Sequence, residues 1–154
     1  MTRLTVMTAT MTVISILSSQ AAARPAGCFE RTYSGSHLSS NPKQDIRRLI
    51  INIAQSGSEA TFSVKAWLKA HPQIWRAGGG CKPAGESWRC LTDTDGDPEL
   101  LIHPIAKGIR LENPHRLKLF DDQTGPDLNT SDISGPANRV FVLMQTAAKL
   151  CAQE

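Results

Sequence analysis

Residues 46–68 read Ile-Arg-Arg-Leu-Ile-Ile-Asn-Ile-Ala-Gln-Ser-Gly-Ser-Glu-Ala-Thr-Phe-Ser-Val-Lys-Ala-Trp-Leu, and this stretch decides the fold. Apolar side chains recur at every second position on both sides of residues 55–59, namely Leu49, Ile51 and Ile53 before them and Phe62, Val64, Ala66 and Leu68 after them. A period of two is typical of strands with one buried face. Gln-Ser-Gly-Ser-Glu between the runs has the composition of a turn. The stretch therefore predicts a β-hairpin with Trp67 on its outer face.

Further short strands are predicted where apolar residues lie between turn residues such as Gly, Pro, Asn and Asp. They span residues 88–91, 99–103, 108–112, 116–120 and 139–145. About seven short strands at roughly ten-residue spacing, without a long helix between them, are typical of an antiparallel sandwich or barrel. The predicted fold class is thus all-β, a small antiparallel β-sandwich or barrel stapled by disulfides.

Three segments receive a local interpretation of their own. Residues 36–41 and 144–153 are compatible with short helices, too short to change the fold class. The three glycines at positions 78–80 are interpreted as a tight turn before Cys81.

The first 23 residues have the three parts of a cleaved export signal. Arg3 supplies the charged start, residues 4–17 form the apolar run, and Ala21 and Ala23 form an A-x-A cleavage site. Thr and Ser interrupt the run, which is shorter than the roughly 20 apolar residues of a membrane span. We therefore expect cleavage after Ala23, a single β domain over residues 24–154, no membrane span, and a periplasmic or secreted location.

Four cysteines remain after cleavage, and an even number in an oxidising compartment predicts two disulfides. Three pairings of Cys28, Cys81, Cys90 and Cys151 are possible, and the sequence alone leaves them open. We favour Cys81 with Cys90, which flank a Gly/Pro-rich turn, and Cys28 with Cys151 at the two chain ends. A zinc site is disfavoured because the sequence has no Cys-x-x-Cys pair.

Cys28 has a second possible use as a lipoprotein anchor. The segment Pro25-Ala26-Gly27-Cys28 resembles the box of bacterial lipoproteins in its last three residues. However, Pro25 stands where a branched apolar residue is usual, and a polar stretch separates Cys28 from the apolar run. Acylation of Cys28 is therefore the minor alternative to a disulfide.

Catalytic and metal-binding motifs are absent from the sequence. It has no G-x-S-x-G nucleophile elbow, and its four histidines lack the spacing of metal ligands. Asp93, Asp95 and Asp97 resemble part of a calcium loop, but the glycine and glutamate of an EF-hand are missing at positions 6 and 12. A turn between strands explains them better. We expect a protein that is not an enzyme and has no cofactor or bound metal.

The charge balance is mildly basic, with a formal net charge of +3 that falls to +2 when residues 1–23 are removed with Arg3. Nucleic-acid binders usually carry a basic stripe, whereas here only Arg47 and Arg48 are adjacent, so no nucleic-acid partner is expected. An arginine pair on a strand is interpreted as part of a solvated face. The predicted contacts with a partner are instead the outward Trp67 and the loop residues Asp93, Asp95 and Asp97.

Three groups of residues carry a resemblance to a known family. They are Cys28-Phe-Glu-Arg-Thr-Tyr33 with His37-Leu38 and Asn41-Pro42, Trp88-Arg-Cys90 before an Asp-Gly turn, and Arg139-Val-Phe-Val-Leu143 with Cys151. In these the chain resembles a family of small, uncharacterised exported proteins of the alphaproteobacterial periplasm. Members of that family carry a further cysteine before an Asp-Gly-Gly turn, from which this chain departs. The resemblance implies export and a single domain, and it implies no activity.

Two functions follow from these expectations. A small disulfide-stapled β domain without catalytic residues is typical of a non-enzymatic binding or inhibitory module, with a protein or a glycan as its partner. The alternative is a carrier that holds a small apolar ligand inside a calycin-like barrel. An enzyme whose residues lie far apart in sequence is a third possibility.

Overall fold

The computed structural model describes residues 24–93, 99–121 and 130–152, so the signal peptide predicted at residues 1–23 lies outside the described residues. The described strands are β1 (Gly27–Thr32), β2 (Ile46–Ser56), β3 (Glu59–Leu68), β4 (Ile74–Ala84), β5 (Ser87–Thr92), β6 (Glu99–Ile105), β7 (Gly108–Glu112), β8 (Leu117–Asp121), β9 (Thr130–Ile133) and β10 (Val140–Thr146). The helices are α1 (Gly35–Ser40), the 3-10 turn η1 (Pro136–Asn138) and α2 (Ala148–Ala152).

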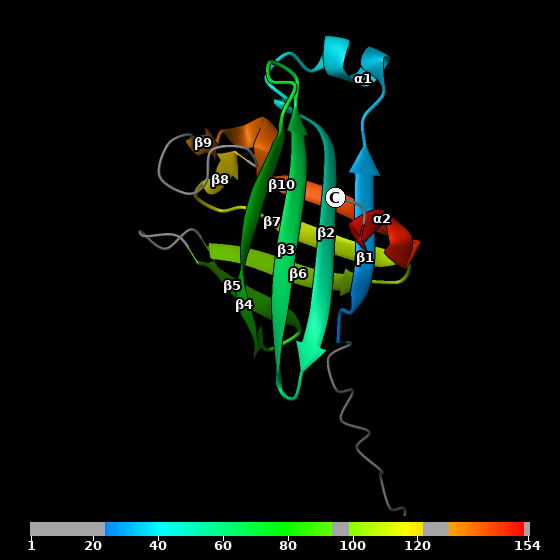
Figure 1. Ribbon diagram of the computed structural model, residues 1–154, viewed down its shortest axis with the longest axis vertical. Coiled ribbons are helices and arrows are strands. Elements are labelled where there is room, and N and C mark those ends of the chain that lie inside the picture. Colours follow the sequence, from blue (N-terminus) through cyan, green and yellow to red (C-terminus); the bar gives the residue numbers. More distant parts are fainter. Residues whose placement is uncertain (1–23, 94–98, 122–129, 153–154) are drawn as a thin grey trace, which may run out of the picture.

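Eight of these strands close into an antiparallel barrel. The order is β3-β2-β1-β10-β7-β6-β5-β4, and β4 pairs with β3 to complete the circle. Strands β1 to β7 thus follow one another around the wall, and β10 fills the gap between β7 and β1. In Figure 1, β1, β2 and β3 run along the front of the barrel and β6, β7 and β10 cross behind them. The all-β prediction is confirmed, and the closed barrel is the form it takes.

The β8–β9 hairpin extends the sheet beyond the closed wall. It is joined at the start of β4, where Trp75 pairs with Asp121 and Arg76 with Phe120. Farther along the same strand, from Gly79 onward, β4 pairs with β5 instead. One long strand therefore serves both the barrel and the extra hairpin.

The hairpin predicted from residues 46–68 is present as β2 and β3. Ile51 lies opposite Val64 and Ile53 opposite Phe62, so the alternating apolar residues of the two strands meet on the inner face. Only two residues connect the strands, and Gly57 has a φ of 61°. Glycine adopts this left-handed conformation without strain, which suits so short a loop.

The barrel interior is a single apolar core. Inward side chains from all eight wall strands form one cluster with side chains of β8 and β9. Phe141, Leu143, Leu100 and Leu111 are fully buried in it. An eight-stranded barrel is just wide enough for side chains to fill its interior or to hold one small ligand.

The interpretation of residues 78–80 as a tight turn is wrong, because these residues lie inside β4, where all three pair with β3 and the last two also pair with β5. A Cβ atom on Gly79 would lie 2.0 Å from the carbonyl oxygen of Leu91. Glycine here thus permits a close approach of two strands, not a change of chain direction. The turn before β5 comes later, at Gly85, which has a φ of 66°.

The described part of the chain has three strands that the sequence does not predict, namely β1, β4 and β9. In addition, β10 continues to Thr146. The predicted helix over residues 144–153 is therefore reduced to the five residues of α2. Apolar outward residues on β10, such as Val142 and Met144, obscure the period-two pattern that would have marked the strand's extent.

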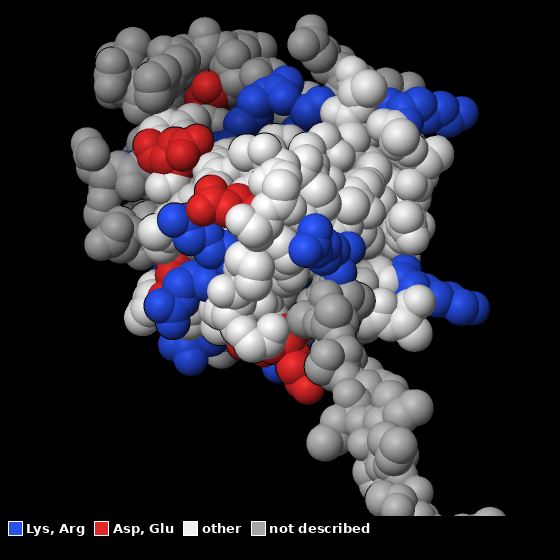
Figure 2. Space-filling view, turned by 90° about the horizontal axis from the view of Figure 1, so that it is seen from below, with Lys and Arg blue, Asp and Glu red and all other residues white. Residues whose placement is uncertain are grey.

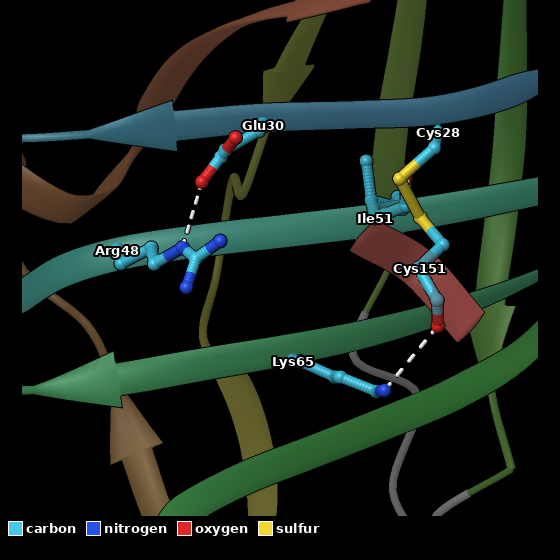
Figure 3. The surroundings of a disulfide bond; sticks show 6 residues. All are labelled: Cys28, Glu30, Arg48, Ile51, Lys65 and Cys151. Atoms are coloured by element: carbon cyan, nitrogen blue, oxygen red, sulfur yellow. Dashed lines mark hydrogen bonds and ion pairs between the residues drawn. A yellow bond between two sulfur atoms is a disulfide. The ribbon is translucent and has the colours of Figure 1, made fainter. Parts of the chain in front are cut away.

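The two favoured disulfides are both present, Cys28–Cys151 and Cys81–Cys90. Cys81 and Cys90 lie directly opposite each other on β4 and β5. Cys28 lies on β1 and holds α2 against the outside of the barrel, where the Lys65 ammonium group donates a hydrogen bond to the Cys151 carbonyl at 3.3 Å (Figure 3). A sulfur atom in a disulfide is not available for acylation, so this bond argues against the lipoprotein alternative.

The disulfides also bear on the compartment. Two disulfides indicate an oxidising, extracytoplasmic environment. No helix in the described part of the chain is long and apolar enough to cross a membrane.

Candidate functional site

A β-bulge at the start of β2 brings two adjacent arginines to the same outer face. Ile46 is paired with Leu68 and Arg48 with Trp67, so the register shifts by one residue between the two pairs. Ile46 and Leu49 are both fully buried although they are three positions apart. In a regular strand Arg47 and Arg48 would point to opposite faces, and the extra residue of a bulge re-aims one of them. Both arginines consequently line one groove.

This groove has a volume of about 350 Å³ and lies at the α1 end of the barrel. Figure 1 shows α1 beyond the end of β1, next to the end of the barrel where β2 begins and β3 ends. The groove is lined by side chains from β1, the following segment, α1, β2 and β3: Thr32, Tyr33, Leu38, Arg47, Arg48 and Trp67. We call it the Trp67 groove. Its size is at the lower end of the range of small-ligand sites, roughly 300 to 1,000 Å³.

The guanidinium group of Arg48 is fixed in place by two neighbours. Its Nε donates a hydrogen bond of 2.7 Å to Oε1 of Glu30 on β1 (Figure 3). Its central carbon lies 4.7 Å from the ring centroid of Trp67, within the range of a cation–π contact. Among the described residues, neither terminal nitrogen of Arg48 has a hydrogen-bond partner. The two terminal nitrogens of the guanidinium group are therefore held in position without a partner among the described residues.

Tyr33 is the second aromatic residue in the lining of the groove. Its backbone N–H donates to the Arg47 carbonyl at 2.9 Å, which ties it to the bulge. The guanidinium carbon of Arg31 lies 4.9 Å from the Tyr33 ring centroid, and the ring of His37 stacks on it at 4.8 Å. Burial raises the pKa of Tyr33 above its usual value of 10.0, and the nearby positive charge of Arg31 offsets only part of this. Its hydroxyl group is neutral at physiological pH.

The raised pKa of Tyr33 can be measured without labelling, because Tyr33 is the only tyrosine in the chain. Absorbance at 295 nm should report a titration midpoint above 10.0 in the folded protein. The unfolded chain loses this proton first, so the contribution of Tyr33 to stability is present below pH 10 and is lost as the pH rises through the raised pKa. The control is the same titration in denaturant, and an equal or lower midpoint for the folded protein would contradict the burial of Tyr33.

Short-range hydrogen bonds position Leu38 over the groove. Helix α1 begins after Ser34, whose side-chain oxygen accepts from the backbone N–H of His37 at 3.2 Å. Asn41 closes the other end, where its side-chain amide donates to the His37 carbonyl at 2.9 Å. Such caps stabilise a helix that is too short to form by itself. The sequence predicted this helix one residue out of place, at residues 36–41.

A buried asparagine fixes the chain just before the bulge. Asn138 in η1 is 1% exposed, and its side-chain amide donates to a carboxylate oxygen of Asp45 at 2.9 Å and to the Ser134 carbonyl at 3.0 Å. Its side-chain oxygen accepts from the backbone N–H of Asp45 at 3.3 Å. The bulge thus starts from an anchored residue, although no local sequence pattern pairs positions 45 and 138.

Two of the four predicted partner contacts, Trp67 and Asp93, lie in different grooves. Trp67 is on the outer face, in the groove that bears its name. Asp93 lines a different groove of about 240 Å³, together with Glu59, Lys82 and Arg89. Asp95 and Asp97 lie outside the described residues. Trp75 and Trp88 are buried in the core at 4% and 2% exposure, so Trp67 is the tryptophan that reaches the surface.

The histidines are dispersed over the described structure. His37 stacks on Tyr33, His71 contacts the edge of Trp75, and His103 lies near Glu112. Within residues 24–93, 99–121 and 130–152, no group of three or more His, Cys, Asp or Glu side chains is arranged to hold a metal ion.

The distribution of charged side chains at the end of the barrel opposite α1 differs from that at the Trp67 groove. Figure 2 views the molecule from the end opposite α1. Uncharged side chains occupy most of the middle of this face, and Lys and Arg lie at separate points around it, mixed on one side with Asp and Glu. The juxtaposition of arginines with aromatic rings described above belongs to the α1 end.

Comparisons with protein-family models, with curated proteins and with solved structures found no match to this chain. The resemblance to a family of exported proteins therefore stays a prediction.

Proposed function

We propose that this protein is a non-enzymatic binding module of the periplasm or the cell exterior, and that its ligand binds in the Trp67 groove. The observation that carries the proposal is the bulge in β2. It places Arg47 and Arg48 side by side on one face, where Trp67 and Tyr33 add aromatic side chains to the lining of the groove. Bulges that re-aim side chains are frequent next to functional sites, and an aromatic wall with oriented polar groups is typical of ligand pockets.

The chemistry of the groove supports binding over catalysis. Arginine is always protonated in proteins, and Tyr33 keeps its proton beyond pH 10. These groups can donate hydrogen bonds and orient a ligand, but they do not exchange protons near neutral pH. The disulfides agree with a location outside the cytoplasm, where such a module would meet glycans or other proteins.

Ligand-observed NMR with a panel of small compounds tests this proposal. The panel should contain neutral, anionic and cationic sugars together with aromatic acids, and should be applied to residues 24–154 and to Trp67→Ala. We expect at least one compound to bind the parent protein and to lose most of its binding in Trp67→Ala. The matched control is Leu91→Ala, which removes an exposed apolar side chain of the other groove. Failure of every compound, or binding that is unaffected in Trp67→Ala, would refute the proposal.

A carrier of a small apolar ligand is the second candidate, and two buried tryptophans favour it. The indole N–H groups of Trp75 and Trp88 are buried, and neither has a hydrogen-bond partner in the described structure. Buried donors are normally paired, so an acceptor on a bound molecule or an ordered water would satisfy them. Native mass spectrometry of freshly purified protein tests this candidate, since a carrier should retain an added mass that denaturation releases. An unliganded native mass would argue against it.

A further inference from the structure

The arginines of the Trp67 groove give it a positive character. Arg31, Arg47 and Arg48 all lie at the groove or against its aromatic wall. Glu30 neutralises one of them through its ion pair with Arg48. The Arg47 side chain is exposed and makes no ion pair with the described residues. A ligand that fits this arrangement carries a negative charge.

The geometry of Arg48 is suited to a planar anion. Its Nε is held by Glu30 and its guanidinium carbon lies over the Trp67 ring, so the group is positioned before any ligand arrives. Arginine binds carboxylates through two parallel hydrogen bonds from the guanidinium fork. A pre-oriented fork loses less conformational entropy on binding than a free arginine side chain.

The aromatic walls and the size of the groove indicate what bears the anion. A groove of about 350 Å³ has the size of a small-ligand site, and its six lining residues are far fewer than the roughly 20 to 30 residues that a protein partner usually covers. The exposed apolar side chains that would suit a protein interface lie elsewhere, on β10 at Val140, Val142 and Met144. The C–H face of a pyranose ring packs well on an aromatic ring such as that of Trp67.

We infer that the Trp67 groove binds a sugar unit that carries a carboxylate, as found in polyuronate glycans. In this assignment Arg48 and Arg47 bind the carboxylate, and Trp67 packs against the sugar ring. The inference rests on the proposed function, because it names the ligand class of the same groove.

The test is isothermal titration calorimetry of residues 24–154 with tetragalacturonate and with its methyl ester. The ester keeps the rings and removes the charges, so it isolates the contribution of the carboxylate. We expect the acid to bind and the ester to bind at least about tenfold more weakly, as for loss of a charge-assisted hydrogen bond. Arg47→Gln and Trp67→Leu should each weaken binding of the acid by a similar factor.

The controls separate this inference from general electrostatic attraction and from misfolding. Arg89→Gln removes an exposed arginine of the other groove and should change the affinity less than about twofold. Thermal unfolding of each variant should match that of the parent protein. Polyphosphate of similar charge should bind more weakly than tetragalacturonate and without dependence on Trp67.

Each contrary result has a distinct meaning. Equal binding of acid and ester would overturn the carboxylate assignment but leave the groove as the binding site. Polyphosphate binding as tight as that of the acid would overturn the sugar assignment. Absence of tetragalacturonate binding would overturn the inference, while the compound panel with Trp67→Ala decides the proposed function separately.

Discussion

Reduction of the Cys28–Cys151 disulfide is expected to lower the free energy of unfolding by about 5 kcal/mol. The two cysteines are separated by 123 positions, and the entropy of closing so long a loop in the unfolded chain gives this value. The bond also holds α2 over the outer face of the barrel, where Ile50 is buried and Lys65 bonds the Cys151 carbonyl. Reduction should therefore both destabilise the barrel and uncover this face.

A matched comparison isolates the effect of loop length. The Cys81→Ala/Cys90→Ala variant keeps only the terminal disulfide, and the Cys28→Ala/Cys151→Ala variant keeps only the short one. Each variant is unfolded in urea with its disulfide intact and again with the disulfide reduced, so that the two measurements compare chains with identical side chains. The short loop has a separation of 9 and should lose about 2.5 to 3 kcal/mol. Equal losses in both variants would contradict the account.

Gly79→Ala is expected to destabilise the protein by about 3 kcal/mol, the upper end of the range for overpacking a well-packed interior. The new Cβ would lie 2.0 Å from the Leu91 carbonyl oxygen and 2.9 Å from the Cα of Thr92. These are backbone atoms of β5, so relief requires β4 and β5 to separate next to the Cys81–Cys90 disulfide. Thermal or urea unfolding of the variant measures the loss.

Gly80→Ala is the control, and the expected effect has the opposite sign. A Cβ at this position meets no atom within 4 Å. Alanine should then stabilise by about 0.5 to 1 kcal/mol, because it reduces the entropy of the unfolded chain. Equal free energies of unfolding for the two variants would contradict the close approach of β4 and β5.

The difference between Gly79 and Gly80 explains why the interpretation of the glycine run as a turn is wrong. Three consecutive glycines are a common turn signal, and no local pattern distinguishes a turn from a close approach of strands. The distinction depends on Leu91, a residue twelve positions away on β5. The hairpin of β2 and β3 was predictable because its whole signal, alternation and a two-residue loop, is local.

The candidate site was only half predictable for a similar reason. Trp67 was identified because the alternation of β3 places it outward. The arginine pair was assigned to a solvated face, although a signal for the bulge was present in the sequence. Ile46 and Leu49 are both apolar at an odd spacing, which breaks the period of two and requires an extra residue between them. Two further features of the site depend on contacts that join separate segments of the chain. They are the position of Tyr33 and Leu38 beside the arginine pair, and the anchoring of Asp45 by Asn138.

The measurement that tests the central claim most directly is an amide NMR titration of residues 24–154 with the compound that binds best. The chain has three tryptophans, and each gives a separate indole N–H signal. Binding in the Trp67 groove should shift the Trp67 indole and the backbone amides of Tyr33, Arg47 and Arg48, and leave the indoles of Trp75 and Trp88 in place. Shifts concentrated on Trp75 and Trp88 would contradict the account and assign the ligand to the barrel interior.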